Sequence, residues 1–127
     1  MKKTVLDVGN CRVDHASIVR LLRANFDVDV IRAPNAKDTI HALQSGVVDL
    51  VLINRHLDAD GSEGIDLIRR LKADPQLAHV PVMLVSNYPE YQEAAVAAGA
   101  ERGFGKAELD DPETVRKLRP FLAGVVS

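Results

Sequence analysis

The sequence predicts an α/β fold, a five-stranded parallel sheet covered by helices on both faces. Short runs rich in branched aliphatic residues alternate five times with patterns of helical period. The run at 48–54, V-D-L-V-L-I-N, is apolar enough for a central strand buried on both faces. No repeat, low-complexity stretch or linker interrupts the alternation. We therefore expect a single domain over residues 1–127, doubly wound with strand order 2-1-3-4-5.

The bulk composition excludes several classes of protein. A chain of 127 residues is long enough to bury a core without disulfides or a structural metal. Its net charge of -2 argues against a broadly basic surface that would bind nucleic acid or an anionic membrane. The lone Cys11 forms no internal disulfide, the first residues do not resemble a signal peptide, and no apolar run approaches the ~20 residues that span a bilayer. We expect a cytoplasmic protein.

The first half of the chain is predicted to contain three strands and two helices. The strands are expected at 4–9, 28–33 and 48–54. Asp14 is the predicted N-cap of the first helix and Asn35 that of the second. The inward positions of the first helix, by helical spacing, are Ile18, Leu21, Leu22 and Ala24.

Asp7 is an unexpected residue in the first predicted strand. A carboxylate there is costly unless it is paired or protonated. The sequence does not identify its partner.

The second half continues the alternation. After a polar loop at 55–64, the pattern predicts a helix, a strand, an alanine-rich helix, a strand and a last helix. Asp111 followed by Pro112 is a typical N-cap and first-turn pair for that last helix, and Pro120 is expected to kink or shorten it. The middle elements are expected at 65–73, 80–85, 90–98 and 102–105.

Polar residues follow the predicted strands at their carboxyl ends. Parallel doubly wound sheets bind ligands beyond these ends. We therefore expect the side chains there to converge. They are Asn10, Cys11, Asn54, His56, Ser86 and Lys106.

Four segments, in order, carry a resemblance to a known family. They are D-L-V-L-I-N at 49–54, V-P-V-M-L-V-S at 80–86, A-G-A at 98–100, and the lysine at 106 after a short strand. Together they resemble the receiver domain of two-component response regulators, over residues 3–122. The resemblance implies a flavodoxin-like fold and a part in phosphorelay signal transduction, without enzymatic activity.

The resemblance also assigns positions in the site. The acidic pair that binds magnesium in the family falls on Asn10 and Cys11, and the phosphoacceptor aspartate falls on Asn54. The hydroxyl and lysine of the family are retained as Ser86 and Lys106. Two further positions differ from the family: Ala107 stands in place of a proline, and Gly103 in place of the aromatic residue that signals the switched state.

These departures change the expected chemistry. An acyl phosphate forms when an anionic carboxylate oxygen attacks phosphorus, and the amide of Asn54 has no such oxygen. Magnesium prefers anionic oxygen ligands, which Asn10, Cys11 and Asn54 do not supply. We therefore interpret the chain as a pseudo-receiver, an atypical member that is not phosphorylated at the usual site and needs no cofactor or metal.

Several alternatives remain open. Asn54 is expected to be a structural amide bonded to Lys106 and to loop backbone. A displaced phosphoacceptor at Asp58 or Asp60 would make the chain an unconventional regulator, and the emptied pocket would otherwise hold a small ligand.

The expected mode of action is contact with a protein partner or with a second copy of the chain. The face predicted for this contact comprises the fourth helix, fifth strand and fifth helix. Tyr88, Tyr91 and Arg102 are its candidate contact residues, because tyrosine and arginine are favoured at interfaces.

Overall fold

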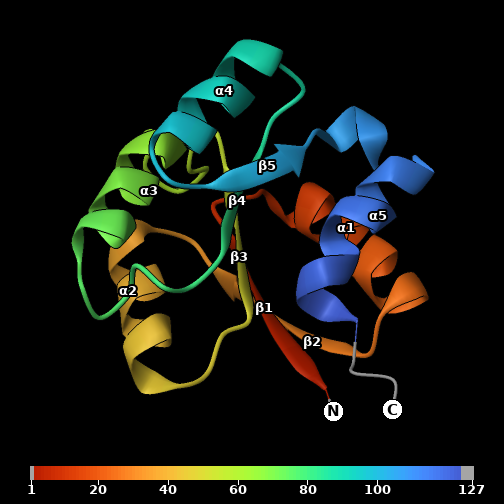
Figure 1. Ribbon diagram of the computed structural model, residues 1–127, viewed down its shortest axis with the longest axis horizontal. Coiled ribbons are helices and arrows are strands. Elements are labelled where there is room, and N and C mark those ends of the chain that lie inside the picture. The colour runs from red at the N-terminus through yellow and green to blue at the C-terminus, as the bar shows by residue number, and fades with distance from the viewer. Residues whose placement is uncertain (1, 124–127) are drawn as a thin grey trace.

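A five-stranded parallel sheet forms the centre of the computed structural model, which describes residues 2–123 (Figure 1). The sheet has the order β2-β1-β3-β4-β5, which confirms the predicted topology. Its strands, in chain order, are β1 (Lys3–Val8), β2 (Val28–Ala33), β3 (Leu50–Asn54), β4 (Val82–Val85) and β5 (Glu101–Phe104).

Helices cover both faces of the sheet, as Figure 1 shows. On one face lie α1 (Arg12–Asn25) and α5 (Pro112–Leu122). On the other lie α2 (Ala36–Ser45), α3 (Gly64–Ala73) and α4 (Pro89–Ala97). A short 3-10 helix, η1 (Lys106–Glu108), joins β5 to α5.

The core consists of two apolar layers, one on each side of the sheet. In β3, Leu50 and Leu52 pack in the layer under α1 and α5, while Val51 and Ile53 pack in the opposite layer. All four side chains are fully buried. Each such burial stabilises the fold by about 1.5–3 kcal/mol. The predicted burial of this strand on both faces is therefore confirmed.

The start of α1 differs from the prediction. Cys11, not Asp14, occupies the N-cap position, and Asp14 lies in the first turn. The chain leaves β1 at Gly9, whose φ of 75° turns the backbone, so the helix begins earlier than expected. Ala24, predicted to face inward, is exposed.

Two other helix starts agree with the sequence. The Asn35 side chain accepts a hydrogen bond from the Asp38 backbone N–H, and the Asp111 side chain accepts one from the Glu113 N–H. Pro120 lies inside α5, which ends two residues later at Leu122. The second strand has the predicted bounds, and the other strand and helix boundaries predicted by number lie within two residues of the observed ones.

Candidate functional site

A small hollow lies at the carboxyl ends of β3, β4 and β5. Its volume is about 240 Å³. Of the side chains that were expected to converge, Asn54, His56, Ser86 and Lys106 line it. Asn10 and Cys11 follow β1 and do not line it.

The amide of Asn54 is engaged by backbone. Its Nδ2 donates to the carbonyl of His56 at 2.7 Å and to that of Gly9 at 3.3 Å. The predicted bond to Lys106 is wrong, because the Lys106 ammonium, which could only donate to the amide oxygen, donates to Asp14 instead. The loop returns to this strand end at Gly64, whose N–H donates to the Arg55 carbonyl at 2.7 Å. A Cβ at residue 64 would lie 2.1 Å from the Asn54 carbonyl oxygen.

Lys106 is paired with an acid on α1 instead. Its Nζ donates to Asp14 Oδ2 at 2.6 Å, and each side chain is 32% exposed. This hydrogen bond holds the pKa of Asp14 below its ordinary value. The sequence pattern assigned Asp14 to a helix cap and so missed it as a site residue. No local signal could identify a partner 92 positions away.

Asp7 belongs to a buried polar cluster beside the end of β1. Its carboxyl group is inaccessible to solvent, accepts a hydrogen bond from Asn10 Nδ2 at 2.5 Å, and lies 2.6 Å from His15 Nδ1. Burial raises the pKa of Asp7, and the contacts with His15 and Asn10 lower it by less. Asn10 is itself buried, and its Oδ1 has no partner within the described residues. The cluster supplies the partners that the sequence left unidentified.

Gln92 of α4 connects the ends of β4 and β5. This buried side chain donates through Nε2 to the carbonyls of Leu84 at 2.9 Å and Ser86 at 3.1 Å, and its Oε1 accepts from the Gly103 N–H at 2.9 Å. The sequence analysis missed it. The available signal was a single long amide at an inward position of an otherwise alanine-rich helix.

Gly103 of β5 lies against the backbone of Leu84 in β4. It is buried, and a Cβ there would lie 2.2 Å from the Leu84 carbonyl oxygen. Real Cβ atoms do not approach backbone so closely. This point of β5 therefore has no room for any side chain.

The two tyrosines differ in exposure. Of these candidate contact residues, Tyr88 is 54% exposed, whereas Tyr91 is half-buried. The Arg55 guanidinium lies 3.8 Å from the Tyr91 ring centroid and donates to its hydroxyl at 2.8 Å, which combines a cation–π contact with a hydrogen bond. Arg102 is exposed.

The two loop acids lie outside the hollow. Asp58 and Asp60 are exposed and do not line it. Asp60 Oδ1 accepts hydrogen bonds from the hydroxyl of Ser62 at 2.6 Å and from its backbone N–H at 2.9 Å, which lowers the pKa of Asp60. Among residues 2–123, no three His, Cys, Asp or Glu side chains are grouped to hold a metal ion.

Solved structures share this arrangement of strands, helices and strand ends. A response regulator from Thermotoga maritima is 23% identical, with a TM-score of 0.77 over 98% of this chain and 100% of its own. The chemotaxis response regulator CheY4 of Vibrio cholerae is 17% identical, with a TM-score of 0.74 over 96% and 100%. The chain has the fold of a response-regulator receiver domain.

Another neighbour is informative about metal binding. The receiver domain of a sensor histidine kinase from Pseudomonas aeruginosa, 17% identical with a TM-score of 0.71 over 98% of this chain and 100% of its own, holds a magnesium ion in its active-site cleft. No protein-family model and no curated protein matches the sequence. Within the described part of this chain, none of the helices has the length and apolar character to cross a bilayer.

Proposed function

We propose that this chain is a receiver-fold signalling module that takes no phosphoryl group at the end of β3 and acts by contact with another protein. The observation that carries the proposal is the state of Asn54. Its nitrogen donates to the carbonyls of Gly9 and His56, which leaves a neutral amide where phosphoryl transfer needs an anionic nucleophile. The side chain holds two loops together instead.

The donor set at the strand ends does not fit magnesium. The side chains that follow β1 and β3 are two amides and a thiol, those of Asn10, Cys11 and Asn54. The nearby carboxylates are already engaged, Asp7 in its buried cluster and Asp14 by a lysine. A hard divalent cation prefers several anionic oxygens. We infer no metal-dependent step for this site.

The contacts of α4 support a surface held in one conformation. Gln92 binds both β4 and β5, and Gly103 presents no aromatic side chain that could change position. A contact surface on α4, β5 and α5 would then be available without a covalent switch. Tyr88 and Arg102 are its exposed candidates.

The alternatives receive less support from the geometry. Asp58 and Asp60 do not line the hollow that holds the retained Ser86 and Lys106, which a displaced phosphoacceptor would need close by. The hollow, about 240 Å³, is smaller than the ~300–1,000 Å³ of typical ligand pockets.

Intact mass spectrometry after incubation with acetyl phosphate and magnesium tests the proposal. We expect no added phosphate on the native chain. Asn54→Asp, run beside it, reports whether a carboxylate at this position restores the reaction. An added phosphate on the native chain would overturn the proposal, and mapping the modified peptide would show whether Asp58 or Asp60 had accepted it.

A further inference from the structure

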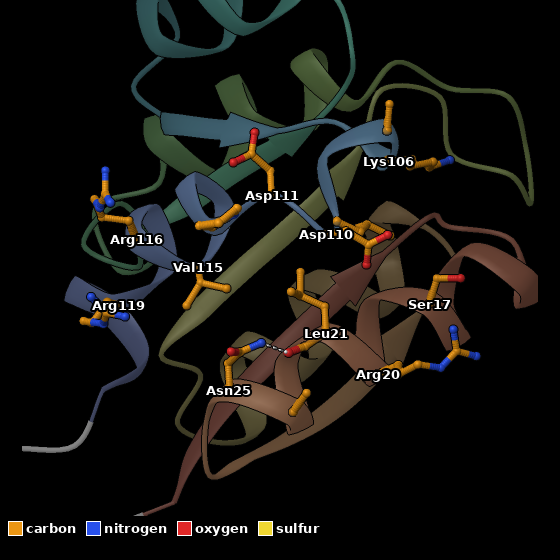
Figure 2. Close-up of a pocket in the computed structure, with 14 residues that line it drawn as sticks. Ser17, Arg20, Leu21, Asn25, Lys106, Asp110, Asp111, Val115, Arg116 and Arg119 are labelled. Carbon is orange, nitrogen blue, oxygen red and sulfur yellow. Dashed lines mark hydrogen bonds between the residues drawn. The ribbon is translucent and has the colours of Figure 1, made fainter.

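A groove of about 720 Å³ runs between α1 and α5 and shares Lys106 with the hollow at the strand ends (Figure 2). One row of side chains from each of the two helices lines it. On α1 they are Arg20, Leu21 and Ala24, and on α5 Val115, Arg116 and Arg119. Both sets have the spacing i, i+1, i+4, which places them on one side of a helix. A groove walled by two helix stripes has the shape that a third helix fills.

The groove is apolar in the middle and basic on its flanks. Figure 2 shows Leu21 and Val115 at its centre, with Arg20 on the α1 flank and Arg119 on the α5 flank. Within residues 2–123, neither arginine has a hydrogen-bonded or ionic partner for its guanidinium. Arg116 pairs only with Glu113 of its own helix; both are exposed, and such pairs contribute little. A helix that fits this groove carries acids beside small apolar residues.

The outer face of α4 has this composition. Glu90, Glu93, Val96 and Ala97 are all exposed on it. Neither glutamate side chain has a partner within the described part of the chain, and Val96 is 42% exposed. Alanine and valine occupy both the buried and the exposed sides of α4, which is typical of a helix covered on more than one side.

The length of α4 and the position of its acidic residues also match the groove. The nine residues of α4 span about 13 Å at 1.5 Å per residue, and the part of α5 that lines the groove, from Pro112 to Arg119, spans about 12 Å. The acids of α4 lie in its first half, whereas the groove carries Asp110 and Asp111 at the end where α5 begins. An antiparallel placement of α4 against α5 therefore brings the glutamates to Arg116 and Arg119 and keeps them away from those aspartates.

We propose that the groove binds α4 of a second copy of this chain. This inference rests on the proposed function in using the α4 side as the contact surface, and it names the partner. Because α4 and the groove lie on opposite faces of the sheet, each copy offers both surfaces, and the contact is heterologous, joining copies head to tail. One helix in one groove buries less than a standard interface, so association is expected between about 10 µM and about 1 mM.

Sedimentation of the full chain with reciprocal charge changes tests this contact. The native chain should gain mass with concentration, and salt should weaken the gain. The pairs Arg116→Glu/Arg119→Glu and Glu90→Arg/Glu93→Arg should each reduce association at least about tenfold. Equimolar mixing of the two variants should restore it, because every junction then joins opposite charges. A chain with all four changes should associate again. This recovery would show that the double variants lose association because their charges repel, not because they fail to fold.

Arg23→Glu is the matched control, because Arg23 is exposed on α1 but does not line the groove. It should leave association unchanged. A native chain that stays monomeric to about 1 mM would overturn the inference, as would failed recovery on mixing or an equal loss in Arg23→Glu. The phosphate measurement is independent: a monomeric chain that takes no phosphate keeps the proposed function and acts on a different protein.

Discussion

The polar contacts beside the carboxyl end of β1 differ in kind from those at the ends of β4 and β5. Beside β1, ionisable side chains are central, because Asp7 is buried against His15 of α1. At the ends of β4 and β5, the uncharged amide of Gln92 binds backbone groups of both strands, and Gly103 lets them approach. The stability of the contacts beside β1 should therefore depend on pH, and we call this the charged half of the strand-end region. The contacts at the ends of β4 and β5 should depend on packing geometry, and we call this the geometrically fixed half.

This difference shows how a receiver fold remains ordered with an amide at the end of β3. Packing and neutral hydrogen bonds fix the half that lies under α4, the proposed contact surface. The charged half is confined to β1 and α1, and the pair of Lys106 with Asp14 is an ionic link between α1 and η1, which follows β5. The following changes test this division, from the largest expected effect to the smallest.

Gly103→Ala should damage the geometrically fixed half most. The new methyl group would approach the Leu84 carbonyl oxygen, so the two strands must separate. We expect the free energy of unfolding, measured in urea, to fall by about 2–4 kcal/mol. Gly46→Ala is the control, because a Cβ there meets no atom within 4 Å, and it should change stability by less than about 0.5 kcal/mol. Equal effects would contradict the role given to this glycine.

Gln92→Ala should weaken the same half through lost hydrogen bonds. It leaves the Gly103 N–H and the two carbonyls on β4 without their partner in a buried place. A loss of about 2–3 kcal/mol is expected from urea unfolding. Gln44→Ala, an exposed glutamine on α2, should have almost no effect. If the loss of unfolding free energy in Gln92→Ala varied with pH, Gln92 would belong to the charged half instead.

Asp7→Asn should change how stability depends on pH. Because the pKa of Asp7 is raised in the folded state, its contribution is present below the ordinary value of 3.8 and is lost as pH rises through the folded pKa. Relative to the native chain, Asp7→Asn should therefore gain stability as pH increases above about 4. Urea unfolding over a pH series measures this. The exposed Asp27→Asn should leave the slope unchanged, and a difference of opposite sign for Asp7→Asn would reject the assignment.

Asp14→Asn should have the smallest effect, with the opposite sign in pH. The pKa of Asp14 is lowered by Lys106, so its contribution is present above 3.8 and is lost as pH falls through the folded pKa. At neutral pH the variant should be less stable by about 0.5–1 kcal/mol, since both groups are partly exposed. A double-mutant cycle with Lys106→Ala isolates the pair, and a coupling energy near zero would show that it does not link the two halves.

Local patterns in the sequence were sufficient for the fold. Apolar runs and helical periods depend on which residues neighbour one another along the chain, so they predicted five strands and five helices, and the general rules for doubly wound sheets then gave the strand order. The caps at Asn35 and Asp111 were predictable for the same reason, because a cap bonds to N–H groups two or three residues ahead. Asn54 and Ser86 were placed at strand ends correctly.

The pairing of polar groups could not be predicted in this way. Periodicity gives the face on which a side chain lies, but several donors and acceptors compete once strands and helices are brought together. Lys106 meets Asp14 rather than Asn54, and Gln92 reaches across two strands to Gly103. These choices depend on distances between elements far apart in the chain, which no local pattern contains.

The close approach of Gly64 to Asn54 has a consequence for how the chain tolerates mutation. Residue 64 has no functional group, yet any side chain there would push against the carbonyl oxygen of Asn54 and displace the strand end with its amide. In a map of tolerated substitutions this glycine would rank with the polar residues of the hollow. Gly46 would rank far below it, because a side chain there meets only open space. Sensitivity to mutation at Gly64 would therefore reflect the lack of space beside the Asn54 backbone, not a functional group at residue 64.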